Sequence, residues 1–372
     1  MKNSKKIVFF HPYFSDGGVE RTNIGLAKGL IKSGYDVVFV TISPSEHFLE
    51  EVLEFGIQWV VLSARSTLRS QIEFSRWIRL EKKSSCRLVI ISCQYYVNLA
   101  CLLFRPLWGS GVRHILSERN HLDEFLIHRS IKRKLIAKMV SLFYKYADVV
   151  IANSAELARD LSKVTKRSVG IVYNPTVNER LFQLGRQEVR EPWFDEREGP
   201  VIIAVGRLSA QKDFSTLLKA FALLRQTNNA RLLILGDGAE RSSLMKLAEE
   251  LDIVGDLTMP GFVSNPYKFI RHSSLFVLSS AYEGLPNVLI EALAIGVPVV
   301  STSCRSGPTE ILLGGKIGEL VPVAGVNELS EAMRRSLDGL IVRPSLEAIE
   351  ESLARFTPEN SVSQLVSILK KM

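Results

Sequence analysis

Two glutamates, Glu283 and Glu291, lie on either side of a strongly apolar stretch in the segment YEGLPNVLIEALAIG. A buried carboxylate is costly unless it has a partner. Pro286 suits the first position of a helix, so the amide N–H groups of Gly284 and Leu285 are expected to be unbonded. Such a helix start attracts anions, and a carboxylate accepts hydrogen bonds from the paired hydroxyls of sugars. The alternative is structural: Glu283 caps the helix, and Glu291 pairs with a lysine or arginine.

A second segment, AVGRLSAQKDF, places two cations after an expected buried strand. Arg207 follows Gly206, which allows close backbone approach, and Lys212 precedes a helix expected to begin near Asp213. Two cations in this place suit a diphosphate, although an ordinary basic surface loop is the alternative. The strand, glycine loop and helix recur in LGDGAERSSL, which contains Gly236, but most such loops are only tight turns.

Motifs of several other chemistries, such as dinucleotide binding and ATP cleavage, are not found in the sequence. No Gly-x-Gly-x-x-Gly follows the first expected strand and no Walker lysine motif is present, which argues against nicotinamide chemistry and ATP cleavage. No Asp-x-Asp pair of the kind that holds Mg²⁺ on a diphosphate is seen, so we expect no metal and no cofactor. The cysteines have no paired metal spacing and are expected to be buried thiols: Cys86, Cys93, Cys101 and Cys304.

Short apolar, β-rich runs alternate with segments of helical periodicity along the chain. This alternation predicts a doubly wound α/β protein with parallel sheets. The expected strands are 5–11, 36–42, 86–92, 112–118, 147–154, 201–208, 230–238, 257–262, 273–280 and 297–303. The clearest expected helices are 19–35, 213–226, 239–251 and 287–296.

A length of 372 residues favours two domains. The periodicity fades between 173 and 200, where Asn, Pro, Gly and mixed charge predict a linker. We therefore expect domains at 1–185 and 198–355, and a C-terminal helix at 356–372 that packs back on the first domain. Ligands of open α/β sheets bind beyond the carboxyl ends of the strands, so we expect the binding crevice there.

The charge is unevenly distributed. Residues 1–185 contain 27 Lys+Arg and 16 Asp+Glu, a net charge of +11, whereas the remainder has a net charge of −3. The first half is therefore expected to have an anionic partner. No apolar run approaches the roughly 18 residues of a membrane span, and polar residues interrupt the first apolar run, so we expect a cytoplasmic chain.

Basic residues are concentrated in IHRSIKRKLIAKMVSLFYKYA, a segment without acids and with apolar residues at helical spacing. Together with RSTLRSQIEFSRWIRLEKK it predicts contact with an anionic lipid surface, to which each cation contributes about 1 kcal/mol. The alternative is a core-facing helix with a solvated basic face. Nucleic acid is not expected, because motifs that bind RNA or DNA are lacking. The basic residues singled out are Arg129, Lys132, Arg133, Lys134 and Lys138.

The segment EGLPNVLIEALAIGVPVV resembles the signature of retaining GT-B glycosyltransferases of glycosyltransferase family 4, whose two glutamates have seven residues between them. GRLSAQKDFSTLLKAF and FSDGGVERTNIGLAKGL are similar to that family's Gly-Arg-Leu...Lys segment and its N-terminal Gly-Gly-x-Glu-Arg loop. SGPTEIL is similar to the Ser-Gly-Pro-x-Glu-Ile-Leu motif of the family branch that builds lipopolysaccharide cores, O-antigens and polyprenyl-linked glycans. The resemblance, which runs from Lys6 to about Asp338, implies two Rossmann-like domains that face across a cleft, the first binding acceptor and the second nucleotide sugar.

The resemblance also implies roles for individual residues. Arg207 and Lys212 would bind the donor diphosphate and stabilise the leaving group, while Glu283 would bind the transferred sugar and Glu291 the ribose. The implied base pocket is lined by Gly261, Phe262 and Val263 of the strand-end segment PGFV. The full implied donor set is Gly17, Gly18, Gly206, Arg207, Lys212, Gly236, Gly261, Phe262, Val263, Glu283, Gly284, Leu285 and Glu291.

One position departs from the family pattern. Many relatives have a histidine where this chain has Glu118, Arg119 and Asn120, with His121 just beyond. We therefore count Glu118 with the catalytic candidates Arg207, Lys212 and Glu283, and place Arg119 and Asn120 on the acceptor side.

The implied reaction is transfer with retention, by front-face substitution and without metal. The donor would be a UDP-sugar, or alternatively GDP-mannose, carrying a hexose or an N-acetylhexosamine. The acceptor would be a lipid-linked saccharide or a lipopolysaccharide or O-antigen intermediate at the inner face of the plasma membrane. A nucleotide-sugar epimerase of the same architecture and a catalytically silent glycan-binding subunit are the alternatives.

Overall fold

The chain forms two compact units, each built on one parallel sheet. The computed structural model describes residues 5–14, 17–43, 46–84, 87–119, 131–194, 199–340 and 345–372. The first unit comprises Met1–Pro175 together with Pro358–Met372, and the second comprises Thr176–Thr357. The first unit thus ends at Pro175, where the sequence led us to expect residue 185, and it includes the C-terminal helix.

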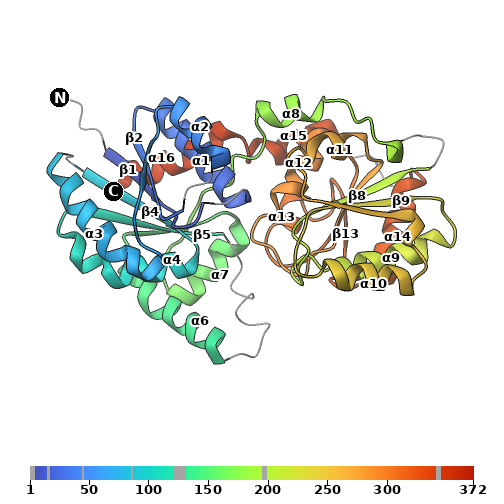
Figure 1. Ribbon diagram of the computed structural model, residues 1–372, viewed down its shortest axis with the longest axis horizontal. Coiled ribbons are helices and arrows are strands. Elements are labelled where there is room, and N and C mark those ends of the chain that lie inside the picture. Colours follow the sequence, from blue (N-terminus) through green and yellow to red (C-terminus); the bar gives the residue numbers. More distant parts are fainter. Residues whose placement is uncertain are drawn as a thin grey trace. The chain divides into compact units, whose positions relative to one another are not determined.

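The described part of the first unit contains a seven-stranded parallel sheet in the order β3-β2-β1-β4-β5-β6-β7 (Figure 1). Its strands are β1 (Lys5–Phe10), β2 (Asp36–Thr41), β3 (Gln58–Val61), β4 (Arg87–Cys93), β5 (Val112–Glu118), β6 (Val149–Ala152) and β7 (Gly170–Ile171). Its helices are α1 (Gly18–Lys32), α2 (Glu46–Glu54), α3 (Thr67–Ser84), α4 (Tyr95–Phe104), α6 (Ile131–Phe143), α7 (Ala155–Thr165) and α16 (Pro358–Lys371), with 3-10 turns η1 (Arg105–Trp108) and η2 (Tyr144–Tyr146).

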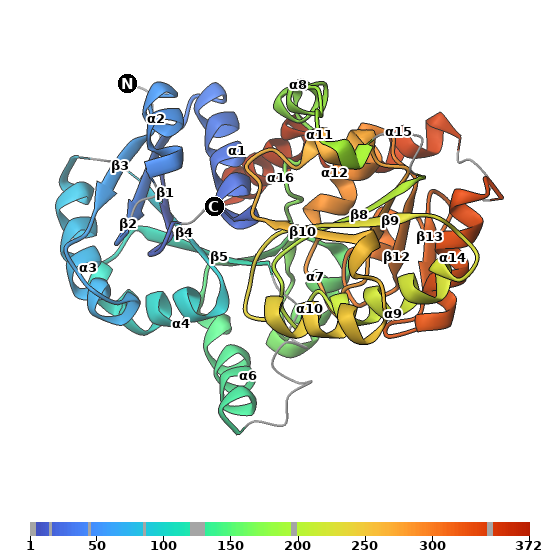
Figure 2. The same ribbon diagram turned by 45° about the vertical axis from the view of Figure 1, so that its right-hand side comes forward.

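Alternate side chains of β1 pack into two different layers. Ile7 and Phe9 join the core beneath α1 and α16, whereas Val8 and Phe10 join the core beneath α3 and α4. This is the period of two that a buried parallel strand shows, and it explains why the buried part of the strand, Ile7–Phe10, is apolar throughout. Figure 2 shows α1 and α16 on one side of this sheet and α3 and α4 on the other.

The second unit, over its described residues, contains a six-stranded parallel sheet in the order β10-β9-β8-β11-β12-β13. Its strands are β8 (Val201–Val205), β9 (Arg231–Leu235), β10 (Leu257–Gly261), β11 (Leu275–Leu278), β12 (Val299–Thr302) and β13 (Glu319–Val321). Its helices are α8 (Glu179–Gly185), α9 (Phe214–Arg225), α10 (Arg241–Glu250), α11 (Tyr267–His272), α12 (Asn287–Ile295), α13 (Pro308–Ile311), α14 (Val326–Leu337) and α15 (Leu346–Ala354), with 3-10 turns η3 (Pro192–Phe194) and η5 (Val254–Asp256).

The structure confirms the predicted α/β class and the strands and helices expected within the described residues. Two details differ. Pro286, which was expected at the first position of a helix, is instead the N-cap of α12. The expected linker contains α8, because the side chain of Asn178 accepts a 3.2 Å hydrogen bond from the N–H of Leu181, whose side chain is buried.

The cysteines and the most apolar helices were also considered in the sequence. Cys93, Cys101 and Cys304 are buried, as predicted, whereas Cys86 lies outside the described residues. None of the helices in the described ranges combines the length and the apolar composition that crossing a membrane requires.

Candidate functional site

Two loops of the second unit are bonded together at the carboxyl edge of its sheet. One loop follows β8 and the other follows β11, and these two strands are neighbours in the sheet. The N–H of Ala281 donates to the carbonyl of Gln211 at 2.8 Å, and the hydroxyl of Ser279 donates to the carbonyl of Lys212 at 2.8 Å. Because parallel neighbours end at the same edge, residues far apart in the sequence meet here.

The carboxylate of Glu283 is the centre of this arrangement, and the residue as a whole is only 6% exposed. Its Oε1 atom accepts hydrogen bonds from Lys212 Nζ and from the hydroxyl of Ser280, both at 2.6 Å. Its Oε2 atom accepts a longer bond, 3.4 Å, from the side-chain amide of Gln211. Glu283 therefore has the partners that a buried charge requires, and it does not cap α12.

The start of α12 lies directly after Glu283. Among the described residues, no backbone acceptor is bonded to the amide N–H of Gly284 or Leu285. With the positive end of the helix dipole, these two donors form an environment that favours an anion. The phosphate and sugar were predicted to lie near these two amides, and that role stays a prediction.

The predicted diphosphate-binding cations differ in their surroundings. Lys212 is largely buried in its ion pair with Glu283, whereas Arg207 is exposed on the same loop. Gly206 makes room for the lysine, because a Cβ at this position would lie 2.9 Å from Lys212 Cε. The loop thus contains one cation fixed in an ion pair, Lys212, and one exposed cation, Arg207.

The loops after β8, β9 and β10 are in close contact at the same edge. Gly236 has a φ of +140°, and a Cβ there would lie 1.9 Å from the carbonyl oxygen of Gly206. The N–H of Gly236 donates to the carbonyl of Gly261 at 2.9 Å. Phe262 follows with a side chain that is 63% exposed, and Val263 is half-buried. These residues, predicted for the base pocket, present an exposed aromatic ring at this edge.

Glu291 lies in the second turn of α12 and is half-buried. Its Oε1 atom accepts a hydrogen bond of 3.2 Å from the hydroxyl of Tyr267 on α11. The structure therefore places both predicted glutamates in the second unit and gives each one a hydroxyl donor from the protein.

Glu118 in the first unit belongs to a buried polar network at the end of β5. Its Oε1 atom accepts a hydrogen bond of 2.6 Å from the amide of Asn98 on α4, and it is also bonded to the hydroxyl of Tyr144. Burial, reinforced by the neighbouring Glu118, raises the pKa of Tyr144 well above its usual value. The network ties β5 to α4 and η2.

Arg119, the residue after β5, is also buried and bonds to two asparagine side chains of the first unit. Its guanidinium donates to the side-chain oxygens of Asn174 at 2.9 Å and of Asn23 at 3.0 Å. Asn23 Nδ2 lies 3.3 Å from Nδ1 of His11, and His11 Nε2 lies 3.5 Å from Glu20 Oε1. Burial lowers the pKa of His11, the charge of Glu20 opposes this effect, and Arg119 adds to it.

The cluster of His11, Glu20 and Asn23 was not predicted from the sequence. One signal was available: Glu20 is the acid of the Gly-Gly-x-Glu-Arg loop. Gly17 is the N-cap of α1 and Gly18 its first residue, and a Cβ at Gly17 would lie 2.6 Å from Glu20 Oε2. The first-unit glycines predicted for the donor therefore lie beside a buried acid.

The basic acceptor-side residues are only partly described. Asn120, His121 and Arg129 lie outside the described residues, and of Lys132 and Arg133 only the backbone is described. On α6, Lys134 and Lys138 are exposed. Leu135, one of the apolar residues at helical spacing in this segment, is 57% exposed between them, whereas Val140, another of these residues, is buried.

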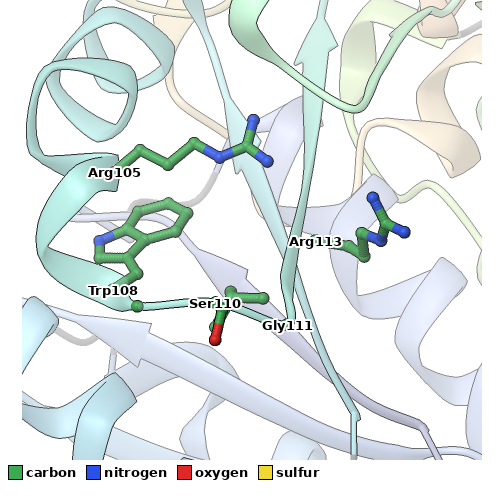
Figure 3. Close-up of a pocket in the computed structure, with 7 residues that line it drawn as sticks. Arg105, Trp108, Ser110, Gly111 and Arg113 are labelled. Atoms are coloured by element: carbon green, nitrogen blue, oxygen red, sulfur yellow. The ribbon is translucent and has the colours of Figure 1, made fainter.

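A pocket of about 310 Å³ lies at the amino end of β5. Figure 3 shows Arg105 and Arg113 on either side of it, with Trp108 and Ser110 between them. Both arginines are bonded to Asp148, at 2.6 Å and 2.9 Å, so their charges help to hold the fold. The pocket lies at the edge of the sheet opposite to the carboxyl ends that carry the predicted residues.

The described ranges contain no group of three or more His, Cys, Asp or Glu side chains placed to hold a metal ion.

Comparisons with known proteins match both halves of the chain to enzyme families. Residues 16–180 match the model for Glycosyltransferase Family 4, and residues 185–350 match that for Glycosyl transferases group 1. An uncharacterized glycosyltransferase of Methanocaldococcus jannaschii is 37% identical, over 55% of this chain and 51% of that protein. The chain thus spans about half the length of this relative.

Two further proteins are similar over more of their length. N-acetylgalactosamine-N,N'-diacetylbacillosaminyl-diphospho-undecaprenol 4-alpha-N-acetylgalactosaminyltransferase of Campylobacter jejuni is 27% identical, over 70% of this chain and 71% of that protein. The solved structure of Anabaena HepE in complex with UDP and glucose has a TM-score of 0.77 at 17% identity, and the match covers 99% of this chain and 100% of that one. That likeness shows a shared fold.

Proposed function

Because the chain belongs to the GT-B glycosyltransferases of family 4, we propose that it transfers a sugar from a nucleotide diphosphate sugar, with retention, to a lipid-linked saccharide or lipopolysaccharide intermediate. The observation that carries this proposal is the position of Lys212, Glu283 and the start of α12 at one sheet edge. Together they offer one cation and two amide donors for a diphosphate beside a carboxylate for sugar hydroxyls.

The proposed step is front-face substitution at the anomeric carbon. The bond from that carbon to the diphosphate oxygen breaks as the bond to the acceptor oxygen forms on the same face, and the departing phosphate accepts the acceptor's proton. Arg207, Lys212 and the amides of Gly284 and Leu285 stabilise the developing charge on the diphosphate. Removing one such donor typically costs about 3 to 4 kcal/mol of transition-state stabilisation.

We propose that the nucleotide is UDP, with GDP as the alternative, and that the sugar is a hexose or an N-acetylhexosamine. UDP is the nucleotide bound in the Anabaena structure that shares this fold. The exposed ring of Phe262 after β10 offers a surface on which a base can stack, and Glu291 offers an acceptor for ribose hydroxyls.

We propose that the acceptor is presented at an anionic membrane surface. The related Campylobacter enzyme is named for a substrate linked to diphospho-undecaprenol. The first 185 residues carry a net charge of +11, and α6 exposes Lys134, Leu135 and Lys138 side by side. An exposed leucine between two lysines combines the apolar and electrostatic contributions on which interfacial binding depends.

We also propose that transfer needs no metal, since Arg207, Lys212 and the start of α12 can neutralise the diphosphate. Transfer that survives EDTA would support this part, and transfer that is abolished by EDTA and restored by Mg²⁺ would contradict it.

The function is tested first by a thermal-shift screen with UDP-glucose, UDP-galactose, their N-acetylated forms and GDP-mannose. A ligand at 100 times its dissociation constant stabilises the fold by about 2.7 kcal/mol, which gives a readily measured shift. The best donor is then incubated with and without an undecaprenyl-diphosphate saccharide, and the linkage is assigned by NMR. An α-linked product from an α-linked donor supports retention. A changed sugar on the nucleotide without acceptor would indicate an epimerase, and donor binding without transfer or hydrolysis would indicate a silent binding subunit.

A further inference from the structure

We propose that Ser280 is a positioning residue that holds the Glu283 carboxylate when donor diphosphate draws Lys212 away, and this inference rests on the proposed function. Ser280 is fully buried, and its hydroxyl donates to Glu283 Oε1 at 2.6 Å. Lys212 Nζ donates to the same oxygen at the same distance. Oε1 of the carboxylate therefore accepts two short hydrogen bonds. One of them comes from Lys212, which also faces the expected position of the nucleotide sugar.

Glu283 needs a second hydrogen-bond donor because the diphosphate is itself negatively charged. A nucleoside diphosphate brings negative charge to the loop that carries Lys212, and the ammonium group must then divide its hydrogen bonds between phosphate and carboxylate. A carboxylate as buried as Glu283 is costly when its cation is shared, and it is also freer to rotate. The Ser280 hydroxyl is neutral, so the arriving phosphate does not compete strongly for it.

The backbone around Ser280 is held in a way that suits this role. Its carbonyl accepts a 2.6 Å hydrogen bond from the hydroxyl of Thr302, a fully buried residue at the end of β12. Thr302, Ser280 and Glu283 thus form a chain of contacts from the end of one strand to the proposed site. The position of the hydroxyl is therefore set by the sheet and not by the ligand.

The arrangement assigns different tasks to the two carboxylate oxygens. Oε1 accepts hydrogen bonds from Ser280 and Lys212. Among the residues that the structure describes, Oε2 has only the 3.4 Å contact with the Gln211 amide, which bonds more closely to the carbonyl of Tyr282 at 3.1 Å. Oε2 is therefore the oxygen with capacity for a sugar hydroxyl. Ser280 should thus affect how the sugar is held and not how the nucleotide is held.

The test compares Ser280→Ala and Ser280→Cys with the wild type. Cysteine keeps nearly the same volume but is a much weaker donor, so it serves if the alanine variant fails to fold. A hydrogen bond to a charged group corresponds to a rate change of roughly tenfold or more. We expect kcat with the nucleotide sugar to fall by about that factor, while the dissociation constant of UDP or GDP alone changes less than about twofold.

A matched control is Ser273→Ala. Ser273 is buried just before β11, and its hydroxyl donates to the carbonyl of Phe269 at 2.7 Å. Loss of this bond should lower thermal stability and leave kcat unchanged. Unchanged kcat in both Ser280 variants, or an equal loss of kcat in the Ser273 control, would overturn the proposal.

A double-mutant cycle with Glu283→Gln shows whether Ser280 acts through the carboxylate. In that background Ser280→Cys should change kcat by less than about twofold, because the charged acceptor is already gone. Effects that simply multiply would refute the positioning role while leaving the proposed function intact. If Glu283→Gln alone leaves sugar transfer unchanged although the donor binds, then the assigned role of Glu283 and the positioning role of Ser280 both fail.

Discussion

Lys212 and Glu283, 71 residues apart in the sequence, form a 2.6 Å ion pair whose side chains are 16% and 7% exposed. Replacing Lys212 by methionine leaves a buried carboxylate without its cation. We expect the free energy of unfolding to fall by about 3 kcal/mol, the lower end for a broken buried pair, because Ser280 and Gln211 remain. Lys212→Arg keeps the charge and should cost less than half as much. Urea unfolding measures both variants, and equal losses would show that the charge is not what stabilises the loop.

Arg207 should affect transfer without affecting stability. It is exposed, so Arg207→Ala should change the free energy of unfolding by less than about 0.5 kcal/mol. Loss of a donor to the departing diphosphate should lower kcat about 10²- to 10³-fold. Arg271→Ala, which removes another exposed arginine of the second unit, is the control and should leave kcat unchanged. A less than threefold change in kcat for Arg207→Ala would remove this residue from the mechanism.

Gly236 is required by the close approach of two loops. Alanine there would adopt an unfavourable φ of +140° and place its Cβ 1.9 Å from the carbonyl oxygen of Gly206. We expect a loss of stability of about 3 kcal/mol or more, together with weaker donor binding because the loop with Arg207 must shift. Gly255→Ala is the matched control, since no atom lies within 4 Å of its Cβ position and its φ is not positive. Thermal unfolding that is the same for both variants would contradict this account.

The architecture was predictable because its signals are local. Each buried strand is an apolar run, and each covering helix repeats its apolar residues at helical spacing. β3 was missed because it has only four residues, and the short apolar run that follows Gln58 does not by itself distinguish a strand from other structure. The helix α8 was missed because its cap and its one strongly buried leucine lie among polar and charged residues.

The candidate site was only partly predictable. Lys212 and Glu283 were found separately, but their pairing depends on β8 and β11 being neighbours, which no local pattern states. Ser280 was missed because a serine in a loop has no distinguishing pattern until its partner is known. His11 and Asn23 were missed for the same reason, since their contacts join β1, α1 and the end of β5. Packing across the sheet determines these contacts.

His114 should make the first unit sensitive to acid. It is fully buried on β5, and burial, with a smaller effect from Arg105, lowers its pKa to about 3. In the unfolded chain the ring takes up a proton near the ordinary pKa of about 6.5. Between that pH and about pH 3 the unfolded state therefore binds more protons than the folded state. The free energy of unfolding should therefore fall by up to about 1.4 kcal/mol per pH unit between about pH 6 and pH 3.

His114→Gln tests this pH dependence because it removes the titrating ring. Its free energy of unfolding, measured by urea at several pH values, should fall less steeply with acid than that of the wild type. His272→Gln, at an exposed position on α11, should keep the wild-type slope. If His114→Gln keeps the full slope as well, other groups are responsible for the acid sensitivity.

The exposed side chains of α6 should make membrane binding depend on charge. Lys134 and Lys138 each contribute about 1 kcal/mol near anionic headgroups, so reversing both charges should weaken binding to phosphatidylglycerol vesicles tenfold or more at low salt. Lys219→Glu with Lys246→Glu changes the net charge equally at exposed positions of the second unit, and it should weaken binding much less. Vesicle sedimentation at 50 mM and 500 mM NaCl measures both pairs. Equal weakening would mean that net charge alone attracts the protein, whereas binding that does not respond to salt would exclude an electrostatic membrane contact through α6.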